Sequence, residues 1–190
     1  MIYISHNDLD QKFIVDSINF FKENIIHTYV WDETRVLGLN RYGFNEVNPP
    51  EIYFKILDLV KLIKSNVDGD ERFLDLQEVE IVKYPCGAHK NFHYDKARKT
   101  TTGASITYIN DGYIGGNTII EGVDVQPISG RTVYFDGRKY RHAVSNVIKG
   151  DRYTLSMWYG KDKTMPINKE FLEIWNDWSK GQFYGKGTLP

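Results

Sequence analysis

Two short segments of the sequence contain side chains that could bind a metal ion together. His93 and Asp95 are separated by Tyr94 alone, and His142 follows in a later segment. If His93 and Asp95 lie on one strand, both point to the same face, because side chains alternate along a strand. Two histidines and one carboxylate bind iron(II) and leave positions open for other ligands. Zinc accepts the same set together with water, so the spacing alone leaves the metal open.

A candidate anion site follows the second histidine. Arg152 begins an expected strand directly after the turn residues 149–151, and Thr154 shares its face. A guanidinium and a hydroxyl together bind a carboxylate well. If this strand runs antiparallel beside His142, the cation lies at a suitable distance for the far carboxylate of a metal-bound dicarboxylic oxo acid. The alternative is an ordinary surface ion pair of Arg152 with Asp151 or another neighbour.

Helical patterns flank the segment that contains these residues. Apolar residues recur at helical spacing over residues 8–26, where Asp8 or Asp10 can cap the first turn. A second helix is expected to begin at Pro50 and Glu51 and to end near residues 65–66. A third, short helix is expected over residues 168–178. Residues 31–48 show no clean period, so we expect a long functional loop or irregular strands, with part of a substrate lid as one role and a structural cover as the other.

From residue 73 onward the pattern changes to short apolar runs with a period of two. Glycine-containing turn sequences separate these runs. Helices followed by many short strands indicate a mainly β protein with flanking helices packed on a sandwich or barrel. The expected strands cover residues 73–76, 79–82, 105–109, 118–120, 132–135 and 153–158.

Length and composition are typical of one globular domain. The chain has 190 residues, of which 14% are aromatic, and a formal net charge of −1. This charge does not indicate binding to nucleic acid or to an anionic membrane. The single cysteine, Cys86, and the lack of a signal-peptide pattern or a long apolar run predict a cytoplasmic protein.

Taken together, these residues resemble the prolyl 4-hydroxylase-like branch of the iron(II)/2-oxoglutarate oxygenases. The resemblance covers roughly residues 79–160, and it rests on an ordered set rather than on one motif. The set comprises Tyr84, Gly87, His93, Asp95, residues 107–111, Gly115, Gly116, Thr118, Pro127, Gly130, Phe135, His142, Gly150, Arg152 and Trp158. It implies a double-stranded β-helix, or jelly roll, in which residues 73–160 are the catalytic core. Residues 1–70 would then be helical support and possible lid, and residues 165–190 a C-terminal helix and tail.

The resemblance also implies roles for the site residues. His93, Asp95 and His142 would be the iron ligands, and Arg152 would bind the distal carboxylate of 2-oxoglutarate. The pocket of the oxo acid would further include Tyr84, Tyr108, Thr154 and, packed behind it, Trp158. Collagen-type enzymes usually have lysine where Arg152 stands, which leaves the substrate subgroup open. His89, four residues before His93, has no counterpart in the family.

The activity implied by this resemblance is hydroxylation of a peptidyl proline or another protein residue. The expected cofactors are iron(II), 2-oxoglutarate as co-substrate and dioxygen, with ascorbate as a further candidate, and the expected partner is a peptide or protein. The same chemistry on a free amino acid, a small metabolite or a nucleobase is the first alternative. A non-catalytic jelly-roll binding module is the second.

Overall fold

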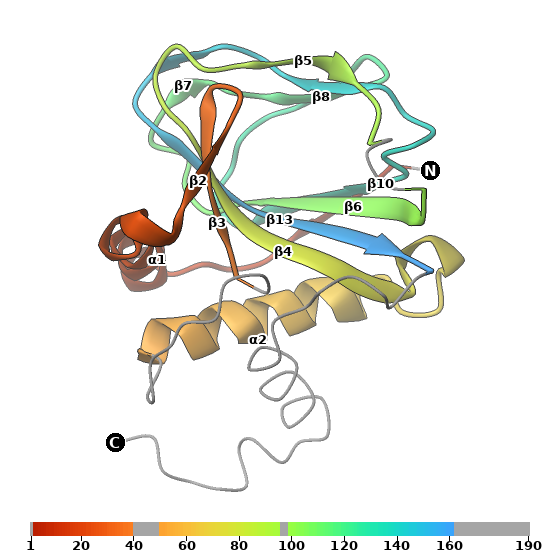
Figure 1. Ribbon diagram of the computed structural model, residues 1–190, viewed down its shortest axis with the longest axis horizontal. Coiled ribbons are helices and arrows are strands. Elements are labelled where there is room, and N and C mark those ends of the chain that lie inside the picture. Colours follow the sequence, from red (N-terminus) through yellow and green to blue (C-terminus); the bar gives the residue numbers. More distant parts are fainter. Residues whose placement is uncertain (1, 40–49, 96–98, 162–190) are drawn as a thin grey trace, which may run out of the picture.

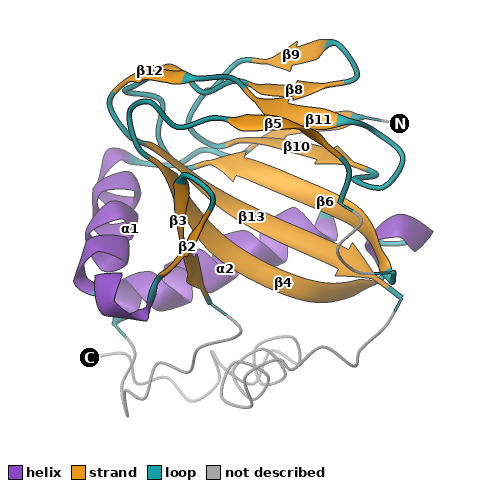
Figure 2. Ribbon diagram, turned by 45° about the horizontal axis from the view of Figure 1, so that its top comes forward, coloured by secondary structure: helices purple, strands orange, loops and turns teal. Residues whose placement is uncertain are grey.

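A computed structural model describes residues 2–39, 50–95 and 99–161 of the chain. Strands dominate this part, and they form two antiparallel sheets that lie face to face (Figure 2). The large sheet has the order β1-β10-β6-β13-β4-β3-β2, and the small sheet has the order β5-β11-β8-β9. The expected fold class, a mainly β protein with a jelly-roll core and flanking helices, is confirmed. The expected helix over residues 168–178 and residues 40–48 of the expected lid lie outside the described residues.

The strands of the large sheet include the longest ones in the described chain. They are β1 (Tyr3–His6), β2 (Tyr29–Trp31), β3 (Thr34–Gly38), β4 (Asp75–Tyr84), β6 (Thr101–Tyr108), β10 (Arg131–Phe135) and β13 (Arg152–Gly160). The small sheet consists of β5 (Lys90–His93), β8 (Thr118–Ile120), β9 (Val123–Val125) and β11 (His142–Val144). A separate pair is formed by β7 (Ile114–Gly115) and β12 (Val147–Lys149).

Two α-helices lie against the outer face of the large sheet, where α2 runs beneath β4 (Figure 1). Helix α1 (Gln11–Glu23) begins where the Asp10 carboxylate accepts a hydrogen bond from the Phe13 amide at 2.6 Å. Helix α2 (Glu51–Ser65) begins directly after Pro50. Short 3-10 turns follow at η1 (Ile25–His27) and η2 (Glu71–Phe73). Both helices were expected. The first is shorter than the expected range of residues 8–26, because it begins at Gln11 and ends at Glu23.

The alternation of side chains along β13 and β4 separates a core from a pocket. Tyr153, Leu155 and Met157 point to the helices and join the core there. Arg152 and Ser156 point the other way, toward the small sheet, and line the pocket between the sheets. The two faces of β13 therefore differ in their surroundings. One face buries apolar side chains against the helices, and the other presents polar groups to the pocket.

Part of the segment expected as a loop or as irregular strands is a regular hairpin. Residues 29–31 and 34–38 are strands β2 and β3, which extend the large sheet beyond β4. Trp31 and Thr34, near the tip of this hairpin, line the pocket. Among the residues that the structure describes, no helix combines the length and the apolar character that a membrane crossing requires.

Candidate metal centre and anion pocket

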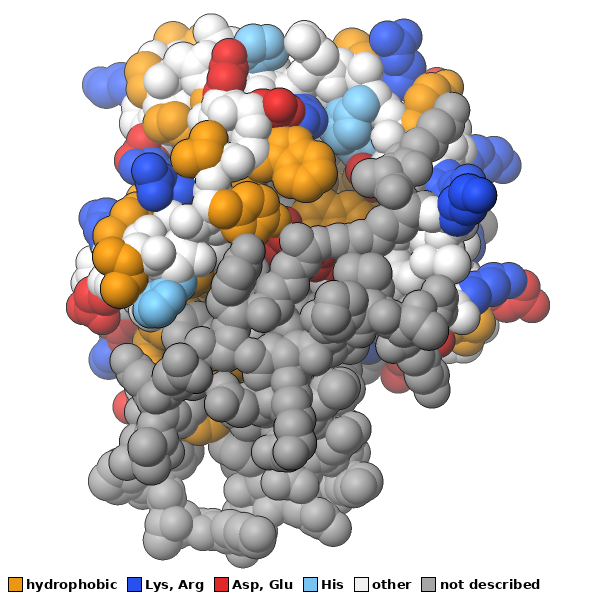
Figure 3. Space-filling view, viewed as in Figure 1, with side chains coloured by type: hydrophobic (Ala, Val, Ile, Leu, Met, Phe, Trp, Pro, Cys, Tyr) orange, Lys and Arg blue, Asp and Glu red, His pale blue; other side chains and the backbone are white. Residues whose placement is uncertain are grey.

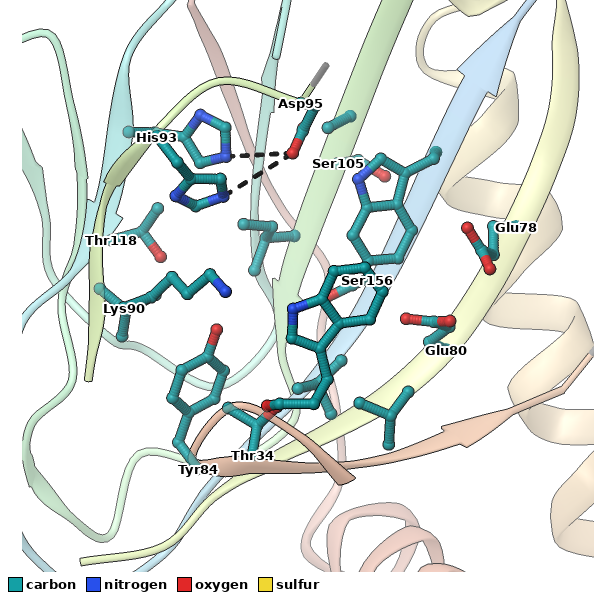
Figure 4. A pocket seen from close by; sticks show the side chains of 18 of the residues that line it. Thr34, Glu78, Glu80, Tyr84, Lys90, His93, Asp95, Ser105, Thr118 and Ser156 are labelled. Carbon is teal, nitrogen blue, oxygen red and sulfur yellow. Dashed lines mark hydrogen bonds and ion pairs between the residues drawn. The ribbon is translucent and has the colours of Figure 1, made fainter. Parts of the chain in front are cut away.

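The three expected metal ligands meet at one end of the pocket (Figure 4). His93 ends β5 and His142 begins β11, and the two residues face each other in the antiparallel register. Asp95 lies beyond the end of β5, not within a strand as expected. Its position is instead fixed by its own amide, which donates to the Gly137 carbonyl at 2.8 Å. The expected proximity is therefore present, although a loop contact produces part of it.

The distances between the ligand atoms suit a shared ion rather than hydrogen bonds. Asp95 Oδ1 lies 3.8 Å from His93 Nε2 and 3.6 Å from His142 Nε2. Metal–ligand bonds of about 2.1 Å bridge atoms up to about 4.2 Å apart. Asp95 Oδ2 is buried without a hydrogen-bond partner in the described part of the chain. This arrangement of donors fits a divalent metal ion.

Backbone carbonyls set the orientation of both imidazoles. The Nδ1 atom of His93 lies 2.9 Å from the Asn91 carbonyl, and that of His142 lies 3.1 Å from the Tyr140 carbonyl. Because a carbonyl only accepts, each Nδ1 carries the proton and each Nε2 presents a lone pair to the site. Burial, followed by the proximity of His142, lowers the pKa of His93. Both effects favour the neutral imidazole, which is the form that binds a metal.

Arg152 occupies a different part of the same pocket and is almost fully buried, with 1% exposure. Its guanidinium carbon lies 4.6 Å from the centre of the Tyr84 ring and 5.3 Å from that of Tyr108. One terminal nitrogen donates to Thr118 Oγ1 at 3.2 Å, and the other lies 3.5 Å from Thr154 Oγ1. Its Nε is buried without a hydrogen-bond partner among the described residues.

The burial of Arg152 excludes the alternative of a surface ion pair. Asp151 instead pairs with Lys83 at 2.7 Å, and no described carboxylate forms an ion pair with Arg152. A buried guanidinium without an anion is costly, so this arrangement fits a carboxylate ligand. The condition considered above, in which the strand of Arg152 runs beside His142, is not met, since β13 pairs with β4 and β6. Arg152 and His142 belong to facing sheets and meet across the pocket.

The structure places the remaining expected residues at different depths. Tyr84 lines the pocket and directs its hydroxyl into it (Figure 4); burial raises the pKa of this phenol, which keeps it a donor. The Tyr108 hydroxyl bonds within the protein, to Thr118 Oγ1 at 2.7 Å. Thr154 is completely buried. Trp158 lines the pocket six residues along β13 from Arg152, opposite Glu78 and Ala104 of the neighbouring strands.

Sequence reasoning missed several residues of the pocket. Thr118 was noted only within a glycine motif, yet its hydroxyl contacts both Arg152 and Tyr108. Glu78 and Glu80 line the pocket from β4, and their period-two spacing within an apolar strand was the available signal. His89 pairs with Glu33 at 3.0 Å, and exposed Cys86 bonds the Ile148 carbonyl through its thiol. Neither His89 nor Cys86 is among the residues that line the pocket.

Comparison with known proteins agrees with this geometry. Residues 79–160 match the model of the 2OG-Fe(II) oxygenase superfamily. The matched segment, somewhat less than half of the chain, is similar to the 2OG-Fe(II) oxygenases. It contains all three candidate metal ligands and Arg152, and the expected resemblance to the prolyl 4-hydroxylase-like oxygenases is confirmed. No curated protein sequence matches the chain.

Solved structures with the same fold include several prolyl hydroxylases. A Pseudomonas putida prolyl-4-hydroxylase is 17% identical, with a TM-score of 0.67 over 85% of this chain and 92% of that one. The viral collagen prolyl hydroxylase of Paramecium Bursaria Chlorella virus-1, in complex with 2OG, is 17% identical, with a TM-score of 0.62 over 85% and 96%. A Trichoplax adhaerens prolyl hydroxylase, in complex with a hypoxia inducible factor peptide fragment, is 16% identical, with a TM-score of 0.65 over 87% and 85%. At these identities the likeness shows that the chain shares their fold.

Proposed function

We propose that this chain is an iron(II)- and 2-oxoglutarate-dependent dioxygenase that hydroxylates a residue of a peptide or protein, with proline as the first candidate. The observation that carries the proposal is the placement of two complementary sites in one pocket. Three ligand atoms fit a metal ion at one end, and a buried guanidinium without a carboxylate partner in the described chain lies at another. A dicarboxylic oxo acid spans such a pair of sites.

Each residue of the site has a defined task in this proposal. His93, Asp95 and His142 hold the ion, and Arg152 binds the far carboxylate of the co-substrate with charge-assisted hydrogen bonds. The Tyr84 hydroxyl donates to the same carboxylate, while Tyr108 and Thr118 hold the guanidinium in place. When bound, iron(II) with 2-oxoglutarate and dioxygen supplies the oxidising power for hydroxylation, with release of succinate and carbon dioxide.

The walls of the pocket surround the proposed metal site and co-substrate site with apolar side chains. These side chains come from both sheets, among them Val82, Ile106 and Phe135 of the large sheet and Val144 of the small sheet. They exclude water from the metal end and strengthen the electrostatic contacts inside. We propose that the described sheets and helices act as one catalytic domain of this kind.

A peptide substrate is supported by the fold relatives and by the shape of the surface. The Trichoplax adhaerens structure with the same fold was solved with a peptide fragment. On this chain, a hollow with hydrophobic side chains and a histidine at its rim opens on the face shown in Figure 3. Trp31 and Tyr94, both exposed, are among the lining residues, and aromatic side chains of this kind are common in peptide-binding surfaces.

Two measurements test the proposal. Anaerobic calorimetry should detect iron(II) binding and then 2-oxoglutarate binding, and the His142→Ala variant should lose the first. With oxygen and ascorbate, the loaded protein should form succinate and add one oxygen atom to proline-containing peptides, as read by mass spectrometry. The enzymatic proposal is contradicted if the chain binds neither iron nor the oxo acid, or if it binds both and forms no succinate. Either result favours a non-catalytic binding module. If another residue of the peptide is oxidised, the proposed oxygenase activity stands and only the assignment of proline as the substrate residue changes.

A further inference from the structure

One buried tyrosine near the co-substrate site has no role in the proposed mechanism. Tyr113 lies in the loop between β6 and β7, is 7% exposed, and is not among the residues that line the pocket. Its hydroxyl is buried without a hydrogen-bond partner in the described part of the chain. A buried phenol normally has such a partner, because an unpaired polar group in the interior is costly.

The unpaired hydroxyl of Tyr113 lies beside the unpaired Nε of Arg152. Gly116 shows how close the two side chains are, since a Cβ there would lie 3.0 Å from Arg152 Cδ and 3.0 Å from Tyr113 Cε2. Cδ is bonded directly to Nε, and Cε2 is next to the ring carbon that carries the hydroxyl. A buried donor and a buried acceptor, each without another partner among the described residues, therefore occupy the same small region.

The loop that contains Tyr113 also fixes the backbone of Arg152. The Asn110 side chain donates to the Asp151 carbonyl at 2.9 Å and accepts from the Tyr153 amide at 2.8 Å. These two bonds hold the residues on either side of Arg152. The segment that follows β6 thus sets the start of β13 through Asn110, and it brings one polar group to the Arg152 side chain through Tyr113.

The other two tyrosines around Arg152 have different tasks. The Tyr108 hydroxyl donates to Thr118 Oγ1 at 2.7 Å and accepts from the Thr118 amide at 3.0 Å. The Tyr84 hydroxyl is directed into the pocket (Figure 4). Burial raises the pKa of Tyr113, although the Arg152 guanidinium acts in the opposite direction. Tyr113 is therefore a neutral phenol whose oxygen can accept a hydrogen bond from Nε.

We propose that Tyr113 is a positioning residue for the co-substrate, and that its hydroxyl accepts a hydrogen bond from the Nε–H group of Arg152. This inference rests on the proposed oxygenase function, in which Arg152 binds the far carboxylate of 2-oxoglutarate. Nε is then held by Tyr113 and one terminal nitrogen by Thr118, which fixes the guanidinium plane between the two flanking tyrosine rings. The remaining N–H groups are oriented for the carboxylate before it binds.

Anaerobic calorimetry with Tyr113→Phe tests this role without turnover. The change removes the hydroxyl and keeps the ring beside Arg152. In protein loaded with iron(II), the Kd for 2-oxoglutarate should rise about two- to tenfold, the range for one hydrogen bond. The Kd for 2-oxopentanoate, which lacks the far carboxylate, should be the same in the parent and the variant, because the orientation of Arg152 no longer matters. The affinity for iron(II) alone should be unchanged.

A double-mutant cycle assigns the effect to the contact with Arg152. Lysine has no Nε–H group of the guanidinium kind, so adding Tyr113→Phe to Arg152→Lys should not weaken 2-oxoglutarate binding any further. The matched control is Tyr134→Phe, which removes a buried hydroxyl that bonds Ser5, Asn66 and the Ile63 carbonyl outside the pocket. This control should lower the melting temperature and leave the Kd for 2-oxoglutarate unchanged.

Nuclear magnetic resonance of protein with isotope-labelled arginine observes the contact without any ligand. The Nε–H signal of Arg152 is the one that disappears in Arg152→Lys. We expect this signal to exchange slowly with solvent in the parent. Tyr113→Phe should shift the signal and speed its exchange, whereas Tyr134→Phe should leave it in place.

The results separate this inference from the oxygenase proposal. The inference is overturned if Tyr113→Phe and the parent bind 2-oxoglutarate equally, if its effect adds fully to that of Arg152→Lys, or if the Nε–H signal does not move. The oxygenase proposal survives each of these results as long as the parent binds 2-oxoglutarate through Arg152. If the parent binds no 2-oxoglutarate, the oxygenase proposal and the co-substrate role of Tyr113 fail together.

Discussion

The metal end of the pocket is assembled from the small sheet and a loop, whereas the anion end lies on three neighbouring central strands of the large sheet. The His93 side chain is 34% exposed, and Asp95 lies outside any strand. Arg152, by contrast, is 1% exposed and is held between two tyrosine rings on the longest strand pair. Packing fixes the anion end in advance, whereas the ligands of the metal end need the ion itself to offset their mutual desolvation.

This difference predicts distinct consequences when each end is altered. Changes at the metal end should affect iron binding and turnover more than folding, because the His93 side chain is partly exposed and Asp95 lies in a loop, although His142 is buried against Phe135. Changes at the anion end should alter the affinity for 2-oxoglutarate and also lower stability, because buried packing is lost with the charge.

The largest expected effect is that of His142→Ala. Removal of a ligand should lower iron-dependent succinate formation more than about 100-fold, beyond the loss typical of residues that only orient ligands. Anaerobic calorimetry should show weakened iron binding, while the circular dichroism spectrum stays that of the parent. Retained turnover would contradict the assignment of His142 as a ligand.

Arg152→Ala should raise the KM for 2-oxoglutarate by about 10- to 100-fold, because charge-assisted hydrogen bonds contribute about 1.5–3 kcal/mol. The melting temperature should also fall, whereas the affinity for iron(II), measured without the oxo acid, should be unchanged. Arg152→Lys keeps the charge and should recover part of the loss. An unchanged KM in the alanine variant would refute the anchor role.

Gly137→Ala should disturb the metal end without removing any ligand. A Cβ at this position would lie 2.1 Å from Asp95 Oδ2, so the carboxylate must move. We expect iron affinity to fall about tenfold, as for other residues that orient ligands. Gly112→Ala is the matched control, since its Cβ would meet no atom within 4 Å. Equal iron affinity in the two variants would argue against close packing at Asp95.

The smallest effect is expected for Tyr84→Phe. This change keeps the ring against Arg152 and removes one hydrogen-bond donor, which contributes about 0.5–1.5 kcal/mol. The KM for 2-oxoglutarate should rise about two- to tenfold, with kcat nearly constant. If kcat falls and KM does not change, the hydroxyl acts at the metal or on the substrate rather than on the co-substrate.

The sequence by itself determined the elements and the chemical groups. Proline, aspartate and helical spacing located α1 and α2, and period-two runs located β4, β6, β8, β10 and β13. The spacing of His93, Asp95 and His142 permitted a metal site, and Arg152 permitted an anion site. The resemblance of the longer ordered set of residues to the iron(II)/2-oxoglutarate oxygenases singled out these four.

Only the tertiary structure decided how the groups face one another. Local patterns give the alternation along a strand but not its neighbours, so a position of β13 beside His142 was considered, whereas β13 lies in the opposite sheet. Asp95 is positioned by the Gly137 carbonyl, a contact between segments distant in the chain. The burial of Glu78 and Glu80 has the same cause. A glutamate at every second position of a strand is expected to face solvent, but here the facing sheet encloses that side of β4 in the pocket.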